Sequence, residues 1–269
     1  MPRQPVSPAV TFPERAVPLS SWKPTRDLLA RDYTIEHRAL LTIGMPGAEI
    51  RDSAAIRVDA SLRRTAAGGF AGVISAIAIG RTGNAGQAPT GLSFPFAVAA
   101  PPATLRLLPA FTAGLPAAAA SCPSPVPVAL NALHDLMIPL PDSLYVGASW
   151  TDSVGTVACA GGIEIPMAVG RVYTVTRHAD AGSVDSLPLD HVAIRRTSRV
   201  TINTHVFRGG DTTFVLGQGT STLTFLVATQ TGDVLAGYGT ANLQVTARSA
   251  TQQEQAAQAS TVRLWQRRR

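Results

Sequence analysis

The sequence has little charge and few aromatic side chains. Charged residues make up 15% and aromatic residues 6% of its 269 residues, against about 25% charged residues in typical soluble domains. The low charge excludes a highly charged disordered chain, and the 45% of hydrophobic residues is enough for a substantial core. Because the chain also contains 23 Gly and 20 Pro, the composition favours many short strands joined by turns over a helical bundle.

Cysteine and long apolar runs are scarce as well. The two cysteines, Cys122 and Cys159, form no Cys-x-x-Cys motif, which excludes a disulfide scaffold and predicts a reducing compartment. Whether these two cysteines are bonded to each other stays open. The most apolar stretch, residues 92–120, is interrupted by several prolines, and this argues against a membrane span. The first residues lack the apolar segment of a secretory signal.

Motifs for catalysis, cofactors and metals are also missing. The sequence contains no GxSxG, HExxH, GxGxxG or P-loop pattern. His134 and Asp135 are adjacent, as are Asp190 and His191, but neighbours on a strand point to opposite faces and cannot pair there. The carboxylates fit neither a calcium loop nor a zinc set. We therefore expect a protein that is not an enzyme and binds neither cofactor nor metal.

Alternation of apolar and polar residues predicts strands from Tyr33 onward. From Ile56 to Leu62, apolar residues alternate with charged or polar ones, which places one set on the core face and the other in solvent. The segment from Ile35 to Ile43 has the same period, with His37 on its apolar side. Further strands are predicted over residues 70–79, 92–99, 143–150, 163–177, 191–207, 212–216, 222–228 and 234–247.

Glycine-rich segments between these stretches predict short turns, including Gly217-Gln218-Gly219. The last three strands should form a meander in which Leu223 and Phe225 face the same core as Leu243. Two short helices are predicted, over 129–137 and over the Gln- and Ala-rich residues 251–260. The Ala- and Pro-rich residues 101–127 suit a long connection. This divides the chain into a Pro-rich extended arm (1–32), an antiparallel β-body (33–247) and a C-terminal helix with a basic tail (248–269).

The basic residues suggest a polyanionic partner. The net charge is +6, and every basic residue except Lys23 is an arginine, whose planar guanidinium matches phosphate. The terminal arginines lie near Trp265, which could stack on a base. The alternative is a set of isolated, solvated arginines. The candidate nucleic-acid-binding residues are Arg195, Arg196, Arg199, Arg263, Arg267, Arg268 and Arg269.

The Pro-rich arm, the weakly charged β-body and the basic end together resemble the coat proteins of small icosahedral viruses. The segment from Gly232 to Tyr238, continuing through Leu243 and Val245, looks like the closing strand of such shells. The resemblance implies a single jelly-roll β-sandwich that self-assembles into a capsid and contacts the genome, expected to be RNA, through its arginines. It also implies a location in the virion and, during assembly, in the host cytoplasm. The virus family, the host, RNA against DNA and the lattice number stay open.

Two other readings stay open beside the capsid protein. The segment from Ala55 to Arg64 is similar to a strand of the plant-virus movement proteins of the 30-kDa superfamily, which bind single-stranded RNA, but Leu62 stands where that family has Asp. The third reading is a ligand-binding β-sandwich module without a viral role. Its three tryptophans are too far apart in the sequence to predict a sugar-stacking platform.

Overall fold

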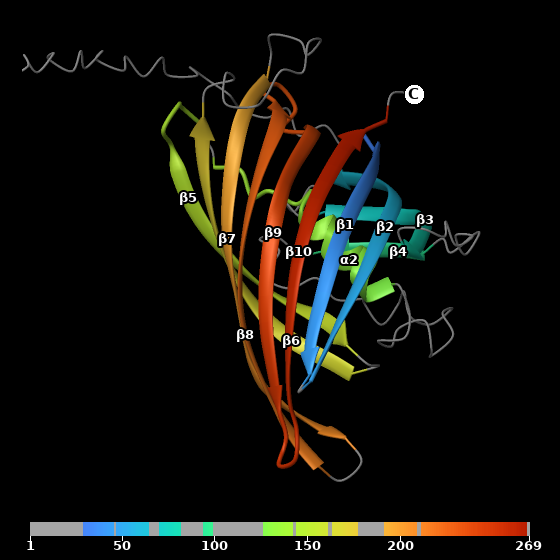
Figure 1. Ribbon diagram of the computed structural model, residues 1–269. Helices are drawn as coiled ribbons and strands as arrows, with labels where there is room; N and C mark the ends of the chain where they lie inside the picture. Colours follow the sequence, from blue (N-terminus) through green and yellow to red (C-terminus); the bar gives the residue numbers. More distant parts are fainter. Residues whose placement is uncertain are drawn as a thin grey trace, which may run out of the picture.

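The computed structural model describes residues 29–45, 47–64, 70–81, 94–98, 126–141, 144–160, 163–176, 191–208 and 211–267. Within these ranges, ten strands and one helix are found (Figure 1). They are β1 (Arg31–Met45), β2 (Ala48–Arg64), β3 (Phe70–Arg81), β4 (Phe94–Val98), α2 (Val126–His134), β5 (Ser149–Ala160), β6 (Ile163–Thr176), β7 (His191–Arg208), β8 (Asp211–Ala228), β9 (Val234–Arg248) and β10 (Gln253–Gln266).

All ten strands belong to one antiparallel sheet, in the order β4-β3-β2-β1-β10-β9-β8-β7-β6-β5. Strands that are neighbours in the sheet are also consecutive in the chain, with one exception. β1 pairs with β10, so the first and the last of the described strands lie side by side. The predicted all-β, sandwich-like class is confirmed. The jelly roll is not, because that fold needs the Greek-key order, in which a long connection brings a strand back beside an earlier one. Here, within β1 to β4 and within β5 to β10, each strand instead pairs with the next one along the chain.

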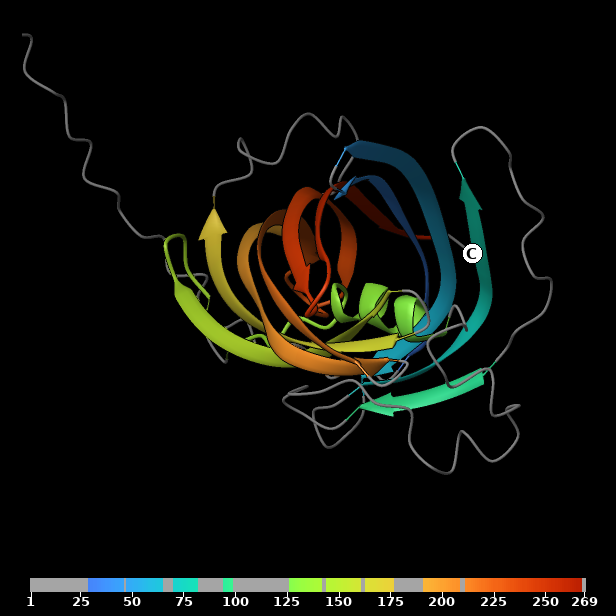
Figure 2. The same cartoon turned by 60° about the horizontal axis from the view of Figure 1, so that its bottom comes forward.

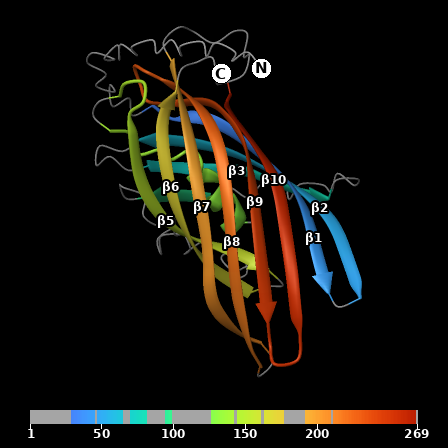
Figure 3. The ribbon, with the colours of Figure 1, turned by 60° about the vertical axis from the view of Figure 1, so that its left-hand side comes forward.

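The sheet curves around α2, which lies on its concave side (Figures 2 and 3). Every second residue of each strand faces this side, so the apolar set of each alternating segment forms the core. Ile35, Ile194 and Phe225 are fully buried there against Leu133 of α2. Burial of side chains of this size stabilises the fold by about 1.5–3 kcal/mol each. The predicted helix near 129–137 is confirmed, although α2 begins and ends three residues earlier.

The predicted C-terminal helix is wrong. Residues 253–266 form β10, which is hydrogen-bonded to β1 on one side and to β9 on the other. Its Gln- and Ala-rich start suits a helix by intrinsic propensity, but two flanking strands offer its backbone a full set of partners. Val262 and Leu264 then enter the core with the period of a strand. The β-body therefore extends past residue 247.

The turn predicted at Gly217-Gln218-Gly219 is also wrong, because β8 runs unbroken from Asp211 to Ala228. A Cβ atom on Gly219 would lie 2.6 Å from the carbonyl oxygen of Asn242, and one on Gly239 would lie 2.1 Å from that of Thr222. These glycines mark a close approach of backbones in the curved sheet. Leu223 and Phe225 do belong to the core under α2, but Leu243 packs in a separate cluster.

Several predictions lie wholly or partly outside the described residues. Residues 1–28 of the predicted arm and residues 101–125 of the predicted connection belong to this group, as does Cys122. Arg31 and Asp32, the end of the predicted arm, are already part of β1. The strand predicted over 143–150 is β5, which begins only at Ser149 and continues to Ala160.

We predict that Gly239→Ala destabilises the protein by about 1–3 kcal/mol, because the added methyl group has no room and the backbones must shift. The matched control is Gly170→Ala on β6, where an added Cβ has nothing within 4 Å. Urea unfolding followed by circular dichroism measures both. Equal unfolding midpoints for the two variants would show that the close approach at Gly239 is not a constraint.

Candidate ligand site in the concave face

The register of the strands arranges the concave face in rows that differ in chemistry. In the rows under α2, apolar residues follow one another from strand to strand. Further along the strands, Ser198 on β7 pairs with Ser221 on β8, which pairs through Ala241 on β9 with Ser260 on β10. We call Ser198, Ser221 and Ser260 the serine row. This row separates the core from the opposite end of the same face.

Beyond the serine row, the concave face becomes apolar again and encloses a cavity of about 500 Å³. Ile165, Ile202 and Val215 are buried around it and pack against side chains that are only partly buried. Ile43 of β1 and Ile165 of β6 line this same cavity, although four strands separate them in the sheet. They face each other because the sheet curves. We call the apolar lining the apolar hollow, formed by Leu41, Ile43, Ile165, Val206, Val215 and Val245.

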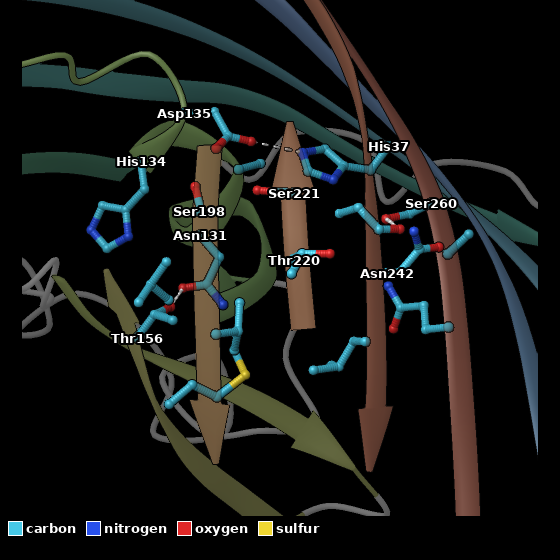
Figure 4. Close-up of a pocket in the computed structure, with 18 of the residues that line it drawn as sticks. His37, Asn131, His134, Asp135, Thr156, Ser198, Thr220, Ser221, Asn242 and Ser260 are labelled. Carbon is cyan, nitrogen blue, oxygen red and sulfur yellow. Dashed lines mark hydrogen bonds and ion pairs between the residues drawn. The ribbon is translucent and has the colours of Figure 1, made fainter. Parts of the chain in front are cut away.

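A second cavity, of about 290 Å³, lies at the serine row itself (Figure 4). It continues from the apolar hollow along the same strands, because Leu243 lines this cavity and Val245, two residues further on the same face of β9, lines the hollow. Its other walls mix aliphatic side chains, such as Ile56 and Met167, with polar ones, such as Ser198 and His37. The concave face therefore offers one elongated, mainly apolar space with polar side chains at the end next to α2 and also at the opposite end, where Asp211 and Glu254 line it.

Ion pairs close the polar end of this space. Asp135, just after α2, accepts a hydrogen bond from the Arg196 guanidinium and lies 3.5 Å from Nε2 of His37. Burial by itself would raise the pKa of Asp135, but Arg196 and His37 hold it well below the usual range of a carboxyl group. The Arg171 guanidinium donates to Asp152 over 2.6 Å. These two pairs fix α2 and β5 against strands β6 and β7.

Four buried polar atoms at this end have no hydrogen-bond partner within the described residues: Nε2 of His37, Nε2 of His134, Nε of Arg196 and Oγ of Ser198. All four residues line the smaller cavity, and Arg196 and Ser198 are 4% and 6% exposed. Buried polar atoms in proteins are nearly always paired, so an unpaired group calls for an explanation. Their position beside a cavity is what a site for a polar ligand atom requires.

The predicted nucleic-acid-binding arginines do not form one group. Arg195, Arg199 and Arg263 are exposed on the convex face of the sheet, whereas Arg196 faces inward and pairs with Asp135. Arg267 is exposed just after β10, where its backbone N–H donates to the carbonyl of Asp32. Arg268 and Arg269 lie outside the described residues.

One part of the convex face does collect basic side chains. Following the register from strand to strand, Arg195 on β7 is succeeded by Thr224, Tyr238, Arg263 and Glu36. We call these five residues the outer row. A cavity of about 490 Å³ lies over them, and the neighbouring Arg38 borders it with a side chain that is 69% exposed.

The serine row and its ionic neighbours were not found by the motif search. The signal that exists in the sequence is weak: His37 interrupts an apolar strand face, and Arg196 and Ser198 stand two residues apart in β7. Only the sheet register and the position of α2 bring them to one cavity. In the described part of the chain, no three His, Cys, Asp or Glu side chains are grouped so as to hold a metal ion. Over the same residues, no helix has the length and apolar character needed to cross a membrane.

We predict that His134 makes the protein less stable in mild acid. Burial, reinforced by the nearby Arg171, lowers the pKa of His134 from 6.5 to about 4. Between these two pH values His134 is protonated in the unfolded chain but stays neutral in the folded protein. The free energy of unfolding therefore falls as the pH drops through this range. The share of His134 in this loss between pH 7 and pH 5 is about 2 kcal/mol. Urea unfolding at both pH values should show a loss smaller by this amount in His134→Gln, and equal losses in both proteins would contradict the assignment.

No protein-family model matches the chain. No curated protein matches it either. Nothing in these comparisons links the chain to viral coat or movement proteins, so its function has to be inferred from the residues and cavities described above.

Proposed function

We propose that this protein binds an apolar small molecule, of the kind that carries a long hydrocarbon chain, in the apolar hollow. The observation that carries the proposal is the cavity of about 500 Å³ between β1 and β6, which falls within the usual range for ligand pockets. Most of its wall area is apolar, with Asp211 and Glu254 among the polar residues that also line it, and the residues around it include Val206 and Val245, which are only partly buried. A hydrocarbon chain placed there would complete their removal from water, which is favourable.

The shape of the space supports an elongated ligand. The hollow and the smaller cavity follow one another along the strands, so a chain can lie parallel to the strands with one end near Ser198 and the rest beyond Val245. Among the three readings of the sequence, this function corresponds to the ligand-binding module. The shell formed by copies of the chain stays a prediction.

We predict that the wild-type protein binds the uncharged fluorescent probe N-phenyl-1-naphthylamine saturably and that Val245→Glu weakens this binding at least tenfold. The reason is that an unpaired carboxylate in an apolar cavity costs several kcal/mol. The matched control is Gln244→Glu, which adds the same charge to the neighbouring, exposed position on the convex face. A fluorescence titration measures the affinity. Absence of saturable binding, or equal affinity of the two variants, would overturn the proposal.

A second function, binding of single-stranded RNA, is favoured by the outer row. Tyr238, which is 42% exposed, lies between Arg263 and Thr224 in this row, and Arg195 follows next to Thr224. Guanidinium groups beside an aromatic ring suit a phosphate backbone with a stacked base. With Arg38 nearby, the basic side chains outnumber the one carboxylate, Glu36. This keeps the sequence-based expectation for Arg195 and Arg263 while moving the proposed contact to the convex face.

We predict that Arg263→Ala lowers the affinity for a single-stranded RNA oligonucleotide and makes its dependence on salt shallower by about one counterion. The control is Arg51→Ala, which removes an equal charge from a residue outside the outer row whose side chain is 74% exposed. Fluorescence anisotropy at several salt concentrations measures both. If the two variants lose the same affinity, the RNA is held by net charge and the outer row is not its site.

A further inference from the structure

The free polar atoms at the end of the hollow have a common chemistry. Nε of Arg196 is a hydrogen-bond donor and never an acceptor, and the hydroxyl of Ser198 can turn its hydrogen toward a neighbour. Nε2 of His37 already faces Oδ2 of Asp135 at 3.5 Å, and Nε2 of His134 can donate or accept according to its tautomer. Neither Nε of Arg196 nor Oγ of Ser198 has a hydrogen-bond partner within the described protein. What they lack is therefore an acceptor.

The acceptors already present are in use. Asp135 accepts from Arg196 and faces His37, and Asp152 accepts from Arg171. Because each guanidinium is matched by one carboxylate, the polar end has no excess of negative charge that would attract a cationic ligand. A ligand amine would bring further donors to a place that already has unpaired ones, whereas a ligand oxygen would satisfy them.

The position of these atoms fixes which part of the ligand they meet. His37 and Ser198 line the smaller cavity, which lies between the buried core under α2 and the apolar hollow. A ligand whose hydrocarbon chain fills the hollow can extend no further than this end. A polar group at that end of the ligand lies beside the serine row, whose residues are labelled in Figure 4.

We propose that the ligand is an amphipathic molecule whose polar end is a carboxyl or ester group, with its oxygen atoms accepting hydrogen bonds from Ser198 and Arg196. This inference rests on the proposed function, since it names the class of molecule held in the apolar hollow. A carboxylate and an ester share the acceptor oxygens, and the experiment separates them.

The experiment compares three ligands with sixteen-carbon chains: hexadecanoic acid, methyl hexadecanoate and hexadecylamine. Each displaces the fluorescent probe from the wild-type protein, from Ser198→Ala and from Thr197→Val. Thr197 is the neighbour of Ser198 on β7 but is exposed on the convex face, so its variant removes a hydroxyl group without touching the cavity.

The acid, the ester or both should bind at least tenfold more tightly than the amine, and Ser198→Ala should weaken that binding about threefold to tenfold, while Thr197→Val leaves it unchanged. Since Oγ of Ser198 has no hydrogen-bond partner among the described residues, its alanine variant should also keep the melting temperature of the unliganded protein. If only the acid binds, the site recognises a carboxylate. If the acid and the methyl ester both bind, the site recognises the acceptor oxygen that the two groups share.

The outcomes separate the two proposals. Equal affinities for all three ligands, unchanged in Ser198→Ala, would overturn the head-group site and leave the apolar hollow as a binding site. Tighter binding of the amine would overturn it as well. If neither the probe nor any of the three ligands binds to the wild-type protein, both the proposed function and this inference are overturned.

Discussion

The structure depends on the curvature of a single sheet. A flat antiparallel sheet of ten strands has two open faces and no interior, whereas this sheet bends until β1 and β6 line one cavity. The bend brings backbones so close that Gly219 and Gly239 have no room for a Cβ atom. The core, the ion pairs and the apolar hollow all lie on the concave side that this bend creates.

The helix α2 divides the concave face into two parts. Where it packs, through residues such as Leu133, the face becomes an ordinary core. At its end, Asp135 engages both Arg196 and His37, and this buried charge cluster bounds the core. Beyond it the strands continue without the helix, and their inward-facing aliphatic residues line a cavity. A mainly apolar cavity that continues from the core is therefore a consequence of a helix shorter than the strands it covers.

The two faces of the sheet carry different chemistry because the strand period is two. Arg195 and Arg196 are adjacent in the sequence, yet one belongs to the outer row and the other to a buried ion pair. A count of basic residues places them in one group, because it does not assign each residue to a face of the sheet. Had the alternation of β7 been used, Arg196 and Ser198 would have been placed with Ile194 on the inner side. Their partner Asp135 would still have been missed, since it comes from another element.

The sequence by itself determined the all-β class, the position of most strands, the short helix and the inward set of each alternating segment. These features are local: they follow from the period of apolar residues and from proline and glycine. Only the tertiary structure decided that residues 253–266 are a strand, that Gly217 and Gly219 lie inside a strand, and that β1 pairs with β10. It also decided which side chains meet at the cavity. Pairing across the sheet joins residues far apart in the chain, and a one-dimensional pattern does not encode which strands become neighbours.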